Sequence, residues 1–307
     1  MHPLNVLCAC LLAVCAVSGH AQQLNVSSGS LERIEDFPSL FVSGRNVDVW
    51  LPDGYSRGKK YAVLYMQDGQ MLFDSASTWN RQEWCMDETA SRLMKEGKVR
   101  DFIVVGIHNI KNLRHSEYMP QEPFESMSRL ERDSLMVAKR PENTPVFSDQ
   151  VFSDRYLMFI VRELKPYIDS AYSTDPGRES TFIGGSSMGG MISLYALCEY
   201  PEIFGGAACI SIHWTGIFTT SNNPFPEQYL RYLKKHLPDP ATHRIYFDHG
   251  TEGLDAMYVQ YQAQADVIMK KKGYTSAQWM TREFPGEGHS EKAWARRLEI
   301  PLVFLLN

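Results

Sequence analysis

The chain is short of cysteine and has no strong excess of either charge. Six cysteines occur in 307 residues, and three of them fall within the first 15 positions, which leaves Cys85, Cys198 and Cys209. An odd number excludes a complete disulfide framework, although a bridge between Cys198 and Cys209 and two buried thiols both stay open. The 31 basic residues are scattered among 36 acidic ones, for a net charge of −5. This balance argues against a nucleic acid or another polyanion as partner.

Long hydrophobic runs and cofactor motifs are missing as well. Beyond the N-terminus, no stretch approaches the roughly 18 apolar residues that a membrane span needs. The sequence has no P-loop, no G-x-G-x-x-G after a first strand and no His, Cys or Asp cluster at zinc spacing. We therefore expect no cofactor and no metal site. With 44% apolar and 22% charged residues, the chain can bury one large core, which predicts a single domain over residues 22–307.

The first 21 residues differ from the rest of the chain. A short apolar segment, Pro3 to Val17, precedes the small residues Ser18 to Ala21, a pattern typical of a secretory signal peptide that is cleaved before Gln22. We therefore expect a secreted or periplasmic protein. The region before the apolar segment carries little positive charge, so a buried N-terminal helix is the alternative. A lipid anchor on Cys10 or Cys15 is a further alternative, although the residue before Cys15 fits a lipoprotein signal poorly.

The most informative motif is the G-x-S-x-G pentapeptide Gly185 to Gly189. It lies between an apolar run, residues 180–184, and a helical pattern, residues 191–200. Strand, sharp turn and helix form the setting in which such a pentapeptide becomes a nucleophile elbow, because the glycines allow a turn that is too tight for flanking Cβ atoms. The central residue, Ser187, would carry an exposed hydroxyl on a strained backbone. A glycine-rich connection that only packs the helix on the sheet is the structural alternative.

A serine nucleophile needs a base that accepts its proton and a carboxylate that orients this base. In enzymes with a nucleophile elbow, the acid and then the histidine follow the serine along the chain. His289 fits the base, because it lies near the C-terminus, directly after a turn at 285–288 that follows the strand-like run 278–284. We expect the other histidines downstream of the elbow to be surface or packing residues, namely His213, His236, His243 and His249.

The acid should lie in the loop that follows the apolar strand 244–248 and precedes a long helical pattern ending at residue 272. Asp255 is the first candidate, and it occupies the expected N-cap of that helix, where a carboxylate can also serve only as a cap. Glu252, three residues earlier in the loop, is the alternative. Asp248 is less suitable, because it lies within or at the end of the strand and its direction depends on the register.

At these residues the chain resembles the esterase D-like serine esterases of the α/β-hydrolase superfamily, the group that includes carbohydrate esterase family 1. The resemblance covers nearly the whole chain after the predicted signal peptide. Taken together, its motifs are far more specific than the pentapeptide alone. They are Tyr61 to Gln70, Leu72 to Asp74, Trp79-Asn80 with Glu83-Trp84, Glu117 to Pro120, Gly184 to Gly190, Gly250 to Glu252 with Leu254-Asp255, and Gly288 to Glu291 with Trp294.

The resemblance implies Ser187 as nucleophile, His289 as general base and a carboxylate in the acid loop. It also implies an oxyanion hole of two backbone N–H groups, that of Met188 after the nucleophile and that of Gln70 in the loop after an early central strand. Relatives often place the acid soon after Gly-Thr in a tighter loop, and this chain has two extra residues there. The identity of the acid therefore stays open.

The order of the expected elements predicts an α/β protein with the α/β-hydrolase fold, a mainly parallel eight-stranded sheet and helices on both faces. The first two strands, joined by short turns, should form an antiparallel edge. Residues that follow strands gather at one edge of such a sheet, so Gln70, Ser187, Asp255 and His289 can share a site. We expect strands near 31–37, 45–51, 61–67, 102–108, 180–185, 206–212, 243–249 and 278–284, and helices near 82–96, 151–170, 187–200, 226–236, 255–272 and 290–299.

Two long segments, 111–150 and 215–240, should shape the substrate pocket at that edge. His108 ends an apolar run and is a candidate pocket residue, and Trp214 is a candidate for stacking on an aryl or sugar ring, although core packing is an equally common use of such an aromatic. The resemblance implies hydrolysis of polysaccharide-linked feruloyl or acetyl esters of the xylan type. A siderophore trilactone esterase and an acyltransferase are the alternatives among enzymes. A glycan-binding protein without turnover is the alternative from another class.

Overall fold

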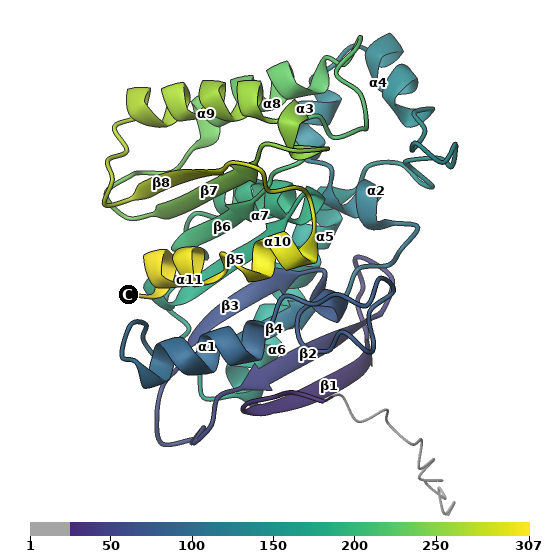
Figure 1. Ribbon diagram of the computed structural model, residues 1–307. Coiled ribbons are helices and arrows are strands. Elements are labelled where there is room, and N and C mark those ends of the chain that lie inside the picture. Colours follow the sequence, from purple (N-terminus) through teal and green to yellow (C-terminus); the bar gives the residue numbers. More distant parts are fainter. Residues whose placement is uncertain (1–24) are drawn as a thin grey trace, which may run out of the picture.

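The protein is built on one eight-stranded sheet, which the computed structural model describes within residues 25–307. The strands lie in the order β1-β2-β4-β3-β5-β6-β7-β8 (Figure 1). β2 pairs antiparallel with β1 and β4, and the other neighbouring pairs are parallel, so the predicted sheet and its antiparallel edge are confirmed. The predicted signal peptide lies outside the described residues. The strands are β1 (Ser30–Phe37), β2 (Arg45–Leu51), β3 (Ala62–Gln67), β4 (Phe102–Ile107), β5 (Thr181–Ser186), β6 (Gly206–Ile210), β7 (Arg244–Gly250) and β8 (Trp279–Phe284).

The central strands are apolar almost throughout because both faces of the sheet are covered. In β3, Val63 and Tyr65 point into the larger hydrophobic core, whereas Leu64 and Met66 point into a second core on the opposite face. Successive side chains of a strand alternate between faces, so a strand with two covered faces reads as a continuous apolar run. This is why the sequence located these strands within one or two residues.

Helices form a layer on each side of the sheet (Figure 1). The larger core is covered by helices from α5 to α9, and the second core is covered by α1, α10 and α11. Within the first layer, α5, a π-helical turn and α6 follow one another without a break. The helices of these layers are α1 (Met86–Lys95), α5 (Ser153–Phe159), the π-helical turn (Ile160–Leu164), α6 (Lys165–Ala171), α7 (Met188–Glu199), α8 (Phe225–His236), α9 (Val259–Lys271), α10 (Glu291–Ala295) and α11 (Glu299–Leu306).

The helices differ from the prediction mainly in the connecting segments. The single helix expected over 290–299 is two helices, α10 and α11, and the helix expected from residue 82 begins at Met86. The segment 111–150 contains three short helices, α2 (Arg114–Tyr118), α3 (Gln121–Glu125) and α4 (Arg129–Met136). Helices of five residues carry too few positions for a periodic pattern. A signal for α4 was present, since Ser128 and Glu131 form a capping box.

The cysteines outside the predicted signal peptide are unbridged. Cys85, Cys198 and Cys209 are free thiols, and the last two are buried. Of the two alternatives left open by the sequence, the structure therefore has buried thiols. No helix within residues 25–307 has the length and apolar character required to span a membrane.

The segment before β1 is held to α1 by Asp87. The backbone N–H groups of Ser27 and Ser28 donate to Asp87 Oδ2 at 2.7 and 3.2 Å. Burial, then the hydrogen bond with Glu88 and the charge of Glu88, raises the pKa of Asp87 from 3.8 to about 7. A buried carboxyl with a raised pKa binds its proton more tightly in the folded protein than in the unfolded chain.

This proton makes stability depend on pH in a predictable direction. The stabilising contribution is fully present below the unfolded pKa of about 4 and is lost as the pH rises through the folded pKa. We expect the melting temperature of the wild-type protein to decrease as the pH is raised from 5 to 8. Asp87→Asn, which keeps an acceptor oxygen without a titrating proton, should flatten this part of the profile in thermal melts. Equal slopes for the two proteins would contradict the assignment.

Candidate active site

Ser187 lies on the sharp turn between β5 and α7. Its backbone has φ 57° and ψ −123°, a conformation that a non-glycine residue adopts only when its surroundings enforce it. The flanking glycines are required by space, because a Cβ on Gly185 would lie 2.9 Å from Gln67 Cβ and one on Gly189 would lie 3.0 Å from the same atom. The turn therefore has the geometry of a nucleophile elbow.

His289 and Asp255 are brought together from two different loops. His289 Nδ1 lies 2.5 Å from Asp255 Oδ1, and the rings of Tyr258 and Trp294 flank the imidazole with centroids at 5.9 and 4.9 Å. An ionised carboxylate at Nδ1 keeps a proton on that nitrogen and leaves Nε2 as the basic atom. This pairing is the one that a serine nucleophile requires.

The environment of Asp255 keeps it ionised. Its second oxygen, Oδ2, accepts hydrogen bonds from Gly250 N at 2.6 Å and Ser211 Oγ at 2.8 Å. Burial opposes ionisation, but the hydrogen bond and charge of His289 and the bonds from Gly250 and Ser211 outweigh burial, so the pKa of Asp255 lies below its ordinary value. The residue begins a 3₁₀ turn and makes no side-chain cap, so the N-cap role considered from the sequence is wrong.

The alternative acid, Glu252, lies apart from His289. Its side chain is exposed and makes no hydrogen bond or ion pair with His289 among the residues that the structure describes. Only its backbone takes part in the site, since Glu252 N donates to Glu287 O at 3.1 Å. The two extra loop residues thus lead the chain around to Asp255, which makes the contact.

Gly250 allows the acid loop and the histidine loop to touch. Glu287 O also accepts a hydrogen bond from Thr251 N at 3.0 Å, so the two loops are joined by backbone bonds. A Cβ on Gly250 would overlap the Glu287 carbonyl oxygen and lie 3.0 Å from Asp255 Oδ2. Only glycine fits between the two loops at this point.

Gly250→Ala should therefore separate the acid from the base. We expect a loss of about 100-fold or more in kcat, since a misplacement of about 1 Å can have that effect. Gly288→Ala is the matched control, because a Cβ there has Glu252 O at 3.9 Å as its nearest neighbour and should leave kcat within about twofold. Turnover of p-nitrophenyl acetate by the two folded variants decides this. Similar rates for both would show that the loop contact is dispensable.

The loop after β3 lies against the elbow and is braced by an ion pair. Asp68, with a positive φ of 57°, accepts from Arg114 Nε and Nη2, both at 2.7 Å, and from Asn109 Nδ2 at 2.7 Å. A Cβ on Gly189 would lie 3.1 Å from Asp68 Oδ2, so this loop touches the start of α7. No local pattern pairs Arg114 with Asp68, because 46 residues separate them.

The two expected oxyanion donors lie on these two adjoining elements. Gln70 belongs to the 3₁₀ turn Gly69–Met71, and its side-chain Oε1 accepts from Asn109 N at 3.2 Å. Met188 is the first residue of α7. Within residues 25–307, neither Gln70 N nor Met188 N donates to a protein acceptor. The assignment of these two groups as oxyanion donors stays a prediction.

Two buried histidines adjoin the elbow. His213 N donates to Ser187 O at 3.2 Å, and the His213 ring contacts the Tyr258 hydroxyl through Nδ1. The His115 ring lies 6.3 Å from the His213 ring, and Phe218 packs against both, at 6.0 and 5.2 Å. His213 is thus a buried packing residue, as expected. Its backbone, however, binds the backbone of Ser187 directly.

The surroundings of these two histidines disfavour a positive charge on either ring. Burial lowers the pKa of His115 and of His213 well below the ordinary value, and the charges of Arg114 and Arg140 lower it further. Both imidazoles are consequently neutral. Arg140 Nη2 lies 3.1 Å from His115 Nδ1, and an arginine can only donate, so the proton of His115 is on Nε2.

The two substrate-binding candidates from the sequence are held elsewhere. His108 Nε2 lies 2.7 Å from Asp48 Oδ2, beside the Arg33–Asp48 ion pair, on the β1–β2 side of the sheet. Trp214 is 1% exposed and packs on Tyr229 and other core rings. The interpretation of Trp214 as a stacking platform is therefore wrong. A side chain shortly after a strand can point to either face of the sheet. Here the turn at Ser211 directs the Trp214 indole into the core.

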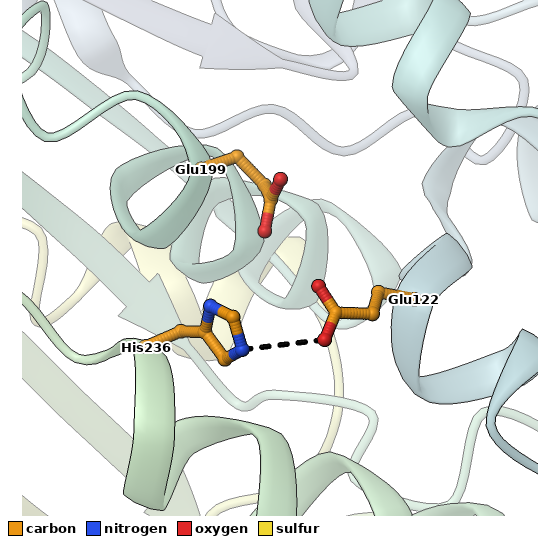
Figure 2. A group of neighbouring side chains, drawn as sticks. All are labelled: Glu122, Glu199 and His236. Atoms are coloured by element: carbon orange, nitrogen blue, oxygen red, sulfur yellow. Dashed lines mark ion pairs between the residues drawn. The ribbon is translucent and has the colours of Figure 1, made fainter.

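One group outside the site has the donors of a cation site. Figure 2 shows Glu122, Glu199 and His236 with their polar atoms facing one another, within 4.8 Å. His236 Nε2 is already paired with Glu122 Oε1 at 3.2 Å, and Tyr232 donates to Glu199. Glu199 ends α7, roughly 18 Å along the helix from Ser187 at 1.5 Å per residue. The group is therefore a separate ion-pair network.

The sequence of the chain matches a known family over most of its length. Residues 41–302 fit the family described as "Putative esterase". The chain belongs to this esterase family. The esterase is accordingly a carboxylic ester hydrolase, which agrees with the arrangement around Ser187.

Individual relatives show how far the similarity extends. The esterase is 24% identical over 272 residues to the uncharacterized protein YbbA of Bacillus subtilis (strain 168), covering 86% of this chain and 93% of YbbA. It is 27% identical over 173 residues to the ferri-bacillibactin esterase BesA of the same strain, covering 54% of this chain and 50% of BesA. Its fold is similar to that of the CE1 ferulic acid esterase AmCE1/Fae1A from Anaeromyces mucronatus in complex with ferulic acid, with a TM-score of 0.61, 19% identity and coverage of 95% and 96%. The likeness confirms the predicted α/β-hydrolase-like fold.

Proposed function

We propose that this esterase is a secreted serine hydrolase that works through an acyl-serine intermediate. The observation that carries the proposal is the part-buried Asp255–His289 pair, with its contact of 2.5 Å, in the loops that follow β7 and β8. Tyr258 packs on the His289 ring and contacts His213, whose backbone N–H donates to Ser187 O, so the pair lies near the elbow. Nucleophile, acid and base follow one another in the chain order typical of this fold.

The reaction proceeds in two acyl transfers. His289 Nε2 accepts the proton of Ser187 as Oγ attacks the ester carbonyl, and the same proton passes to the leaving alcohol. His289 then takes a proton from water, which attacks the acyl-serine, and returns it to Ser187 as the acid product leaves. The negative oxygen of each tetrahedral intermediate binds to the N–H groups of Gln70 and Met188, which contribute about 100 to 1000-fold each.

The substrate class that we propose is a polysaccharide-linked feruloyl or acetyl ester. The fold similarity to a ferulic acid esterase supports it. The partly exposed ring of Phe218 packs on His213, whose backbone N–H donates to Ser187 O, and an aromatic ring this near the elbow suits an aryl acyl group.

A siderophore trilactone is the second candidate, and one observation favours it. Arg140 is half-buried beside His115 and stacks on the Phe218 ring at 5.6 Å, and no carboxylate forms an ion pair with it within residues 25–307. A cation over an aromatic ring near Ser187 suits an anionic catecholate. The similarity to BesA points in the same direction.

A substrate panel separates these functions. The mature protein and Ser187→Ala are assayed with p-nitrophenyl acetate, methyl ferulate and a catecholate trilactone. Fastest serine-dependent hydrolysis of methyl ferulate supports the first class, and fastest hydrolysis of the trilactone supports the second. Product formed on an added alcohol in place of water would identify an acyltransferase. Equal residual rates for the two proteins would overturn the serine mechanism and favour a glycan-binding protein.

We propose a secreted or periplasmic location from the N-terminal sequence alone. Signal peptidase cleavage would give a mature chain starting at Gln22. Mass spectrometry of the protein recovered from each cell fraction tests this. A lipid on Cys10 or Cys15 would appear as an added mass in the membrane fraction instead.

A further inference from the structure

Ser211 lies directly behind the acid Asp255 and is completely buried. Its Oγ contacts three polar groups, Asp255 Oδ2 at 2.8 Å, Arg297 Nη2 at 2.8 Å and Trp294 Nε1 at 3.1 Å. Arginine and indole nitrogens can only donate. Ser211 must therefore accept from both of them, and its own hydrogen can go only to Asp255.

Arg297, which determines this direction, makes its hydrogen bonds through Nη2. Its Nη2 also donates to Asp248 Oδ1 at 2.8 Å, and its guanidinium lies over the Phe284 ring at 4.6 Å. Asp248 accepts further bonds from Tyr246 Oη at 3.0 Å and Ser211 N at 3.2 Å. The cation is 3% exposed and is neutralised by Asp248, so it polarises Ser211 without pairing with the acid of the site.

The backbone at Ser211 is strained in a way that its side chain explains. Its φ is +43°, a region that favours glycine, and β6 ends one residue earlier, at Ile210. The sequence instead predicted that the strand continues to residue 212. A non-glycine residue in such a conformation points to a requirement for its side chain. The hydroxyl is the only polar group that this residue offers to Asp255.

We propose that Ser211 is a positioning residue of this esterase, whose hydroxyl, directed by Arg297 and Trp294, holds Asp255 in the orientation that pairs with His289. The inference rests on the proposed serine mechanism. It adds a layer to the site that comes from the ends of β6, β7 and α10. Ser211 acts through Asp255 and does not touch the substrate.

Ser211→Ala and Ser211→Gly test the proposal together. Both replacements remove the hydroxyl. Glycine also adopts the positive φ without strain, so Ser211→Gly should fold even if Ser211→Ala does not. We expect kcat to fall about tenfold to hundredfold in both, since a hydrogen bond to a charged group is lost, while KM changes less than about threefold. Ser180→Ala is the matched control, because Ser180 is also buried and donates to a carboxylate, Asp175 Oδ2, at 2.6 Å, at the opposite end of β5.

A double-mutant cycle distinguishes positioning from general structural support. In the Asp255→Asn background, Ser211→Gly should lower the residual rate less than twofold, because the group through which it acts is already impaired. A merely structural role would produce the same fold loss in both backgrounds. Equal fold losses in the two backgrounds would overturn the proposal. An unchanged kcat in folded Ser211→Gly, or unfolding of both Ser211 variants, would overturn it as well.

Failure of the inference and failure of the mechanism give different results. Labelling of Ser187 by a fluorophosphonate needs an activated serine but no natural substrate, so its rate is measured for every variant. Rapid labelling of the wild type and of Ser211→Gly would leave the serine mechanism intact and overturn the role of Ser211. Absence of labelling in the wild type would overturn the serine mechanism itself.

Discussion

Ser187→Ala should lower kcat by about a million-fold, which is the scale of loss known for the nucleophile of a complete catalytic triad. The alanine fits the elbow as well as the serine does, since the tight space there is at Gly185 and Gly189 and not at residue 187. The loss should therefore appear in a protein with an unchanged melting temperature. Turnover of p-nitrophenyl acetate and the thermal melt are measured on the same preparation.

The size of the residual rate carries information as well. The oxyanion donors and the binding surface remain in Ser187→Ala, so catalysis of roughly a thousandfold over water is expected to persist. Contamination by another esterase is controlled by fluorophosphonate labelling, which should disappear with the serine. A variant that keeps more than about a tenth of the activity would assign the nucleophile to another residue.

Asp255→Asn should lower kcat by about ten-thousandfold, whereas Glu252→Gln should change it less than about twofold. The amide keeps the size of the side chain, but it would stabilise the wrong tautomer of His289 and could not support the imidazolium charge. Asp255 is buried and in contact with His289, and Glu252 is exposed. The comparison is made on kcat with the same activated ester.

The two variants also test which acid of this loop orients His289 during turnover. Both residues lie in the same loop and each replacement removes one negative charge, so nonspecific electrostatic effects should be similar. A large loss in Glu252→Gln with little loss in Asp255→Asn would show that the loop changes its conformation during turnover and presents the other acid.

The parts of this molecule that the sequence revealed are those determined by local pattern. The apolar strands could be located because each is covered on both faces, and the elbow could be located because the close approach of Gln67 requires glycine at 185 and 189. His289 was predicted from the chain order and from its place in the turn after the last expected strand. Asp255 was named as the first candidate, and the structure pairs it with His289.

The parts that the sequence did not reveal depend on contacts between distant segments. Arg114 meets Asp68 across 46 residues, and Arg297 meets Ser211 across 86. Neither pair has a local signature, because each polar partner reads as an ordinary surface residue in its own segment. Trp214 shows the same limit at a single position: β6 ends at Ile210 and Ser211 turns the chain, which sends the indole into the core.

The position of β8 in the sheet should make turnover stop at a lower temperature than the one at which the core unfolds. Within residues 25–307 it is an edge strand that pairs with β7 alone (Figure 1). None of its residues is fully buried. β5, which leads to Ser187, lies inside the sheet with every residue buried. Edge elements with few buried contacts open locally at a smaller free-energy cost than the centre of a sheet. Such fraying would carry His289 away from a serine that stays in place, so warming would switch off turnover reversibly while most of the protein remained folded.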